Sequence, residues 1–161
     1  MKWRIFFIGL MTLGLVSCSS DDGDSGSDSI VGTWDLVSLQ LDGTSQEEEA
    51  AELLLNQLAA QGCSLITLIF ADGGQATLQT SINYLDPTNL LLGGLTLDCP
   101  TQSDTESASY TYENNQLTIT DSDGMSTTLD ANLAGDRLTL DLEGSEFDDF
   151  GSSGAMIFER R

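Results

Sequence analysis

Three cysteines are the side chains best suited to reactive chemistry in this chain, because its 161 residues include no histidine. Histidine is the usual general base and a common metal ligand near neutral pH, so the commonest route to acid–base catalysis is missing. The cysteines are Cys18, Cys63 and Cys99, and none of them forms the C-x-x-C spacing of a redox pair. A thiolate nucleophile would require one of these thiols to remain reduced.

Carboxylates are the other abundant titratable groups, with 26 Asp and Glu residues against five Lys and Arg. Two carboxylates can supply the acid and the base of glycoside hydrolysis, but in so acidic a chain their proximity in sequence singles out no pair. The sequence also contains no G-x-S-x-G nucleophile elbow and no glycine-rich loop of the phosphate-binding type. We therefore expect no catalytic residue, no metal and no cofactor, and a protein that is not an enzyme.

The first eighteen residues have the pattern of an export signal. Two cationic residues precede an apolar run, residues 5–16, that is too short to act as a membrane-spanning stop-transfer helix. The run ends in Leu-Val-Ser-Cys at 15–18, which resembles the lipobox of bacterial lipoproteins, whereas an ordinary secretory site has small residues in an A-x-A pattern. We expect residues 1–17 to be a signal peptide, with palmitate and other acyl chains on Cys18 anchoring the protein to a membrane.

Residues 18–29 are expected to be a flexible tether, because after Cys18 they consist of Ser, Gly and Asp alone. Aspartates this close to a lipidated cysteine resemble the surface-export signal of Bacteroidota lipoproteins. The resemblance implies an outer membrane lipoprotein displayed at the cell surface. The alternative is a solvated spacer that faces the periplasm.

The charge of the chain restricts its partners. Signal cleavage removes two cations and no acids, which takes the formal net charge from −21 to −23. The cationic side chains that remain are Arg137, Arg160 and Arg161. Such a surface repels phosphate backbones and anionic head groups, so we expect no nucleic acid partner, and a membrane contact through the lipid alone.

Cys63 and Cys99 remain as a pair once Cys18 carries lipid. An exported protein meets an oxidising environment, which favours a disulfide between them over two free thiols. The bridge would close a loop of about 36 residues and stabilise the fold by about 4 kcal/mol in the chain-entropy model.

Residues 30–161 show short runs of alternating apolar residues separated by turn signals, a pattern typical of an all-β barrel or sandwich. The expected strands cover 31–41, 65–70, 75–80, the residues around 110–112, 117–119, 125–129, 138–142 and 155–160. A shift of the apolar phase within the first strand predicts a bulge or a sharp bend. Consecutive hairpins, with turns at 72–74 and 114–115, predict up-and-down antiparallel order.

One segment breaks the strand pattern. Residues 46–60 are rich in Glu, Ala, Leu and Gln, so we expect a helix between the first two strands. Ser45 and Glu48 form a capping box at its start, and Gly62 can end it. A second stretch without strand pattern, 81–98, is rich in leucine, and a disulfide would join it to the helix. The leucines expected on one helix face are Leu54, Leu55 and Leu58, with Leu53 at its edge.

Several of these residues resemble a known family. Residues 32–34, Gly-Thr-Trp, are similar to the G-x-W motif of lipocalins, and Arg160 stands where that family keeps an arginine over the tryptophan. The hairpin at 70–73, Phe-Ala-Asp-Gly, resembles one in the lipocalin-like domains of bacterial lipoproteins. A cysteine before the second strand paired with one after the third belongs to the same resemblance. The resemblance covers residues 30–161.

The resemblance implies a fold: an up-and-down antiparallel eight-stranded lipocalin-like barrel, with one helix inserted between strands 1 and 2. Trp34 and Arg160 would be the structural pair that closes the barrel. The closing strand of a barrel lies beside the first, and a guanidinium can stack on an indole while donating to nearby carbonyls.

Two functions are compatible with such a barrel. A small hydrophobic ligand could occupy its cup, for which Phe70, Tyr110, Tyr112 and Phe158 are the candidate lining. The same four side chains are large enough to fill the barrel themselves. In that case the domain would be a non-enzymatic accessory or binding module that recognises an envelope protein or a glycan through its outer face.

Overall fold

A computed structural model describes residues 29–42, 45–85, 98–143 and 153–161. The expected signal peptide, the expected lipidation site Cys18, nearly all of the expected tether and most of the leucine-rich stretch lie outside these ranges. Among the described residues, no helix has the length and apolar character needed to cross a membrane.

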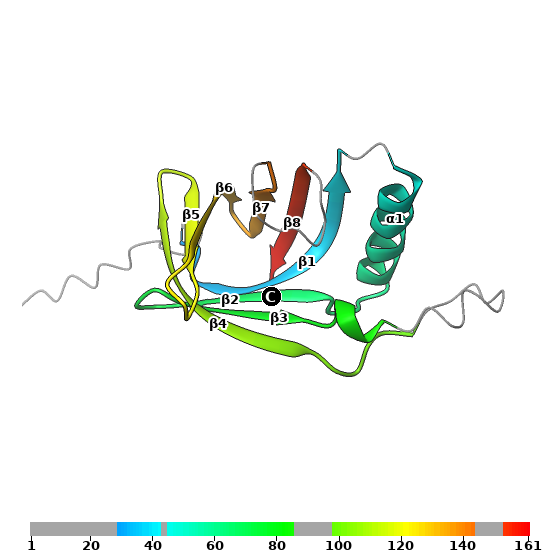
Figure 1. Cartoon of the computed structure of the whole chain (residues 1–161), viewed down its shortest axis with the longest axis horizontal. Coiled ribbons are helices and arrows are strands. Elements are labelled where there is room, and N and C mark those ends of the chain that lie inside the picture. Colours follow the sequence, from blue (N-terminus) through cyan, green and yellow to red (C-terminus); the bar gives the residue numbers. More distant parts are fainter. Residues whose placement is uncertain (1–28, 43–44, 86–97, 144–152) are drawn as a thin grey trace, which may run out of the picture.

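Eight antiparallel strands form a closed barrel, each paired with the next in sequence and the last with the first (Figure 1). They are β1 (Gly32–Leu41), β2 (Ile66–Ala71), β3 (Gln75–Thr80), β4 (Asp104–Glu113), β5 (Gln116–Thr120), β6 (Ser126–Ala134), β7 (Arg137–Asp141) and β8 (Gly154–Arg160). A helix, α1 (Gln46–Ala60), stands between β1 and β2, and a short 3-10 helix, η1 (Ile82–Tyr84), follows β3. The predicted eight-stranded barrel with one inserted helix is confirmed.

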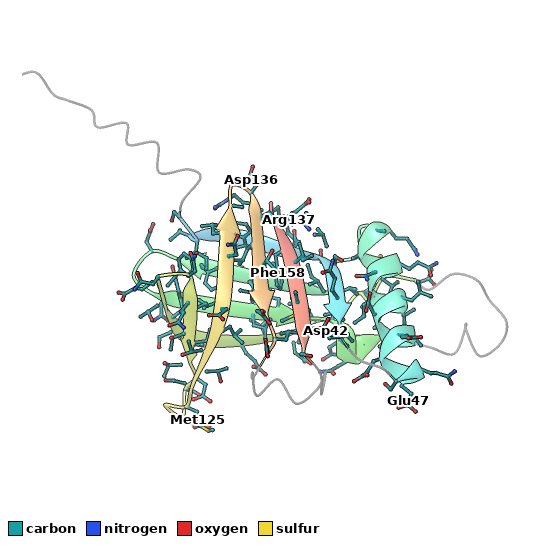
Figure 2. All side chains as sticks on the ribbon, turned by 90° about the horizontal axis from the view of Figure 1, so that it is seen from above. Asp42, Glu47, Met125, Asp136, Arg137 and Phe158 are labelled. Atoms are coloured by element: carbon teal, nitrogen blue, oxygen red, sulfur yellow. A yellow bond between two sulfur atoms is a disulfide. The ribbon has the colours of Figure 1, made fainter. Side chains whose placement is uncertain are left out.

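The barrel has two different ends, which we call the base and the mouth. At the base, β1 begins and β8 ends, and the tight turns at 72–74, 114–115 and 135–136 connect neighbouring strands. At the mouth lie α1, η1 and the turn at 121–125. Figure 2 shows Asp136 and Met125 at the two opposite ends of β6, the first at the base and the second at the mouth.

The turn at 114–115 explains how one base hairpin forms. Asn114 and Asn115 both have positive φ angles, 53° and 61°, which asparagine tolerates better than most residues. Two consecutive left-handed residues make a type I′ turn, whose twist matches that of the flanking strands. The predicted hairpin between β4 and β5 is therefore confirmed, together with the reason for its asparagines.

The core follows from the period-2 alternation of the strands, because residues opposite each other on paired strands project from the same face. The largest side chains with almost no exposure include Trp34, Phe70, Leu117, Leu138 and Phe158, and all face the interior. In β7, Leu138 and Leu140 are buried while Arg137 and Asp141 are exposed, as the alternation predicts.

The predicted bulge in β1 is confirmed as a register shift between Leu36 and Ser38. Before the bulge β1 pairs with both neighbours, and after it β1 continues along β8 up to Leu41, while its ladder with β2 covers only residues 32–35. The second half of β1 therefore has a backbone edge that β2 does not cover.

Helix α1 covers that free edge of β1. The Asn56 amide accepts a hydrogen bond from the Leu39 N–H at 2.7 Å and donates one to the Leu39 carbonyl at 2.8 Å. The Glu52 carboxylate accepts from the Leu41 N–H at 3.0 Å. Side chains of the helix thus replace the missing strand, which satisfies backbone groups that would otherwise be unpaired.

The helix begins and packs largely as the sequence predicts. Ser45 and Glu48 make the reciprocal bonds of a capping box. Leu55 and Leu58 are buried against the barrel, whereas Leu53 is 70% exposed. The disulfide between Cys63 and Cys99 is also confirmed, with Cα atoms 5.2 Å apart, and it ties the chain after α1 to the segment that leads into β4.

Candidate functional site

The base of the barrel is closed by the two residues that the sequence singles out. The Arg160 guanidinium carbon lies 4.2 Å from the centroid of the Trp34 ring. Arg160 Nη1 donates to the Val31 carbonyl at 2.6 Å, and Nη2 donates to the Ser29 carbonyl at 2.7 Å. The indole N–H of Trp34 donates to the Ile30 carbonyl at 2.8 Å. The pair therefore also fastens the chain segment that enters β1.

The strand register and a glycine determine where Trp34 and Arg160 lie. Trp34 and Arg160 are opposite each other where β8 meets β1, so their side chains share the interior face. A Cβ atom added at Gly32 would come within 2.6 Å of Arg160 Nη1, and Gly32 has a φ of 146°, which side chains rarely allow. The glycine of the G-x-W motif is thus required by the close approach of the guanidinium.

The third guanidinium nitrogen of Arg160, Nε, makes an ion pair that also stabilises the closed base of the barrel. Nε is buried and makes no hydrogen bond, but it lies 3.3 Å from a carboxylate oxygen of Asp136, as an ion pair without hydrogen-bonding geometry. The Asp136 side chain is 82% exposed, so solvent weakens this pair. Trp34 and Arg160 consequently hold the base shut and offer no accessible group for chemistry.

The neighbouring Arg161 has partners of its own on the outer face. Its guanidinium donates to both carboxylate oxygens of Asp35, at 2.7 Å and 2.6 Å, and the Thr67 hydroxyl donates to the same carboxylate at 2.7 Å. Because the two arginines face opposite sides of β8, only Arg160 contributes to the interior.

The four aromatic residues proposed as cup lining gather toward the base. Phe70 and Phe158 are 1% and 0% exposed and belong to the packed core. Tyr110 is half-buried, with its ring 4.8 Å from that of Phe70 in an edge-on arrangement. Tyr112 is half-buried as well, and its hydroxyl lies 3.3 Å from the Ala131 carbonyl. These positions fill the barrel near its base, and a ligand lining by them stays a prediction.

Burial also affects the titration of Tyr110. Its hydroxyl donates to the Ala71 carbonyl at 3.1 Å. Desolvation by the surrounding core, followed by the nearby negative charge of Asp72, raises the pKa of Tyr110 above its usual value near 10. The phenol therefore remains a neutral hydrogen-bond donor.

The inner wall near the mouth is different on β3 to β6, where its side chains remain accessible, whereas Leu39, Leu140 and Met156 on β1, β7 and β8 are buried. The register links Trp34 to Leu68, Leu68 to Leu78 and Leu78 to Glu106, so all four project from the inner face. Leu78 is only half-buried and Glu106 is exposed. The other partly exposed inner positions are Thr80, Asp104, Ala108, Ile119 and Thr127. We call this set, with Leu78 and Glu106, the mouth wall.

A polar network lies at the rim of the mouth wall. The Tyr84 hydroxyl donates to one carboxylate oxygen of Asp104 at 2.7 Å, and the Asn83 amide donates to the other at 3.1 Å. These two hydrogen bonds, that of Tyr84 first, lower the pKa of Asp104, and the same bond raises the pKa of Tyr84. The network joins η1 to the start of β4 and orients the carboxylate at the entrance.

A second accessible feature is a depression of about 290 Å³ on the outer wall, which extends from the turn at 114–115 across β5 and β6 to the end of β7. Its side chains are almost all polar and include neither lysine nor arginine. They are Asn114, Asn115, Gln116, Asp130, Asn132, Thr139 and Asp141, beside Ala131. Among the described residues, no group of three Asp, Glu, Cys or His side chains is arranged to hold a metal ion.

Sequence reasoning missed the mouth wall and the outer depression for different reasons. The mouth wall includes the first half of β4, where residues 104–109 contain a single apolar residue and so give no strand signal. The outer depression depends on the register between β5, β6 and β7, which cannot be predicted from the sequence. No protein-family model matches the chain, and no curated protein shows significant similarity to it.

Proposed function

We propose that the protein is a lipid-anchored, non-enzymatic binding module of the cell envelope that holds a small hydrophobic ligand against the mouth wall. One observation supports the ligand site: several inward-facing side chains of β3 to β6 remain partly accessible, while others in the same barrel are completely buried. Leu78 and Ile119 are partly exposed, whereas Trp34 and Leu117 are 0% exposed. A ligand could therefore enter from the mouth and stop at the packed base.

The chemistry of the mouth wall defines the ligand further. Leu78, Ala108 and Ile119 offer apolar surface, for which a hydrocarbon body gains about 25 cal/mol per Å² buried. Glu106 on the same inner wall is an exposed carboxylate that accepts hydrogen bonds. The ligand that fits is apolar along most of its length, with one polar end that donates hydrogen bonds.

The anchor and the non-enzymatic role rest on the sequence. The lipobox-like residues 15–18 support lipid attachment at Cys18. The lack of histidine throughout the chain, and of lysine after Cys18, leaves no ordinary general base or Schiff-base amine. Replacing Cys18→Ser should abolish metabolic acyl labelling of the protein. Labelling that persists in this variant would contradict the anchor.

Native mass spectrometry of the full chain, purified from its own host, tests the ligand site. The expected result is a retained adduct of lipid-like mass that is lost in an Ile119→Trp variant, because the indole fills the mouth. Thr118→Trp is the matched control, since Thr118 is the adjacent residue on the outer face, where its hydroxyl pairs with that of Thr128 at 2.9 Å. An adduct that survives Ile119→Trp, or no adduct in the wild type, would overturn the proposal.

A further inference from the structure

The outer depression points to a second site, independent of the mouth wall. We propose that it binds an uncharged polyhydroxyl ligand, such as one or two sugar units of a glycan. Its volume of about 290 Å³ lies near the lower end of the range found for small-molecule sites. It is on the outer face of the barrel, opposite to the inner face of the mouth wall, so occupation of the mouth wall would leave it free.

The donors and acceptors of the lining select the ligand class. Gln116 and Asn132 each carry an amide that both donates and accepts, and Thr139 carries a hydroxyl that does the same. Asp130 and Asp141 only accept when ionised. Hydroxyl groups match this mixture because each of them can donate one hydrogen bond and accept others.

Charged ligands match the lining less well. A phosphate or carboxylate would face Asp130 and Asp141 with no lysine or arginine in the lining to balance the charge. An ammonium group would suit the two carboxylates, but it has no acceptor for the amide N–H groups of Gln116 and Asn132. A neutral ligand with several hydroxyls satisfies both kinds of group together.

Four of the lining side chains are available for a ligand, while Asp141 already accepts one hydrogen bond, from the Glu143 N–H at 2.9 Å. Within the described residues, the side chains of Gln116, Asp130, Asn132 and Thr139 make no hydrogen bond or ion pair with the protein. Farther along the same outer face, neighbouring polar groups are already paired: the hydroxyls of Thr120 and Ser126 lie 2.7 Å apart. Gln116, Asp130, Asn132 and Thr139 therefore keep their hydrogen-bonding groups free for a ligand in the depression.

The site is also held in place by regular structure. Gln116, Asp130 and Asn132 lie on paired strands, with Gln116 directly opposite Asp130. The turn residue Asn115 is tied to β6, because its carbonyl accepts from the Ala131 N–H at 2.7 Å. Side chains on strands are positioned more accurately than those on loops, which reduces the ordering needed on binding.

Titration of the isotope-labelled full chain by NMR tests the site, with maltose, cellobiose and mannobiose as probes and n-butylammonium as the charged control. For at least one disaccharide we expect shifts confined to the backbone amides of 114–116, 130–132 and 139–141. Gln116→Ala and Asn132→Ala should each weaken that binding by about fivefold to tenfold, the equivalent of one hydrogen bond. Thr118→Ala, on the same face of β5 but outside the depression, should leave it unchanged.

Three results would overturn the proposal: no shift with any disaccharide, equal shifts with n-butylammonium, or equal weakening by Thr118→Ala. Loss of the mouth ligand in Ile119→Trp should not alter the sugar titration. Failure of this site and failure of the mouth site can therefore be distinguished.

Discussion

The base and the mouth of the barrel are made from the same strands, yet they differ in what their inner side chains do. At the base, a guanidinium stacks over a buried indole and donates to the carbonyls of Val31 and Ser29, so the interior polar groups serve the protein itself. At the mouth, Glu106 projects from the inner wall and remains exposed. The difference indicates that the base contributes stability through buried contacts, while part of the inner surface toward the mouth remains accessible.

The largest expected effect comes from emptying the base. Trp34→Ala removes a fully buried indole and its cation–π partner, and should cost about 3–5 kcal/mol of unfolding free energy. Ile119→Ala at the half-buried mouth wall should cost about 1 kcal/mol, because the Ile119 side chain buries less apolar surface on folding than a fully buried one. Denaturant unfolding of both variants measures the difference. Equal losses would mean that the two ends are packed alike.

A smaller effect separates the two adjacent arginines. Arg160→Ala should cost about 1–3 kcal/mol, since it leaves the Val31 and Ser29 carbonyls without their donor and exposes the indole. Arg161→Ala breaks the two-pronged contact with Asp35, but that guanidinium is 57% exposed, so we expect a loss below about 1 kcal/mol. Thermal unfolding of the two variants measures both losses of stability. A larger loss for Arg161→Ala would mean that the outer contact with Asp35, and not the contact with Trp34, stabilises this end of the barrel.

The base was predictable from the sequence because its signals are local. Gly32 and Trp34 lie two residues apart, and the alternation of β7 is visible in neighbouring residues. The contact of Arg160 with Trp34 could be inferred because any closed barrel brings its last strand to its first. The partner of Arg161 was not visible in the sequence, because the strand register brings it to Asp35 far along the chain.

The mouth was less predictable for a physical reason. A strand shows its alternation when one face is buried, and β4 begins with Asp104 and Glu106 on its inner face, where solvent reaches them. The same exposure that leaves the wall open to a ligand removes the pattern by which the strand would be recognised. The hydrogen bonds between Asn56 and Leu39 could not be predicted from the sequence either, because they join a helix side chain to a strand edge 17 residues away.

The smallest expected effect lies in the rim network, and it depends on pH. The pKa of Asp104 is lowered in the folded state, so its contribution to stability is present above the pKa of the unfolded carboxyl, near 4, and is lost as pH falls through the lowered value. The pKa of Tyr84 is raised, so its contribution is present below about pH 10 and is lost as pH rises through the raised value. Solvent reaches both groups and screens their interaction, so both contributions are small.

Tyr84→Phe isolates this network, because it removes the hydroxyl that donates to Asp104 and retains the ring. We expect the melting temperatures of wild type and variant to differ slightly near neutral pH and to converge in acid, as protonation of Asp104 makes the lost bond irrelevant. Asn83→Ala, which removes the weaker donor at 3.1 Å, should give the same convergence with a smaller initial difference. A difference that persists unchanged below pH 3 would show that the Tyr84 hydroxyl stabilises the fold independently of the charge on Asp104. The rim would then resemble the base, where the hydrogen bonds of Arg160 go to uncharged backbone carbonyls.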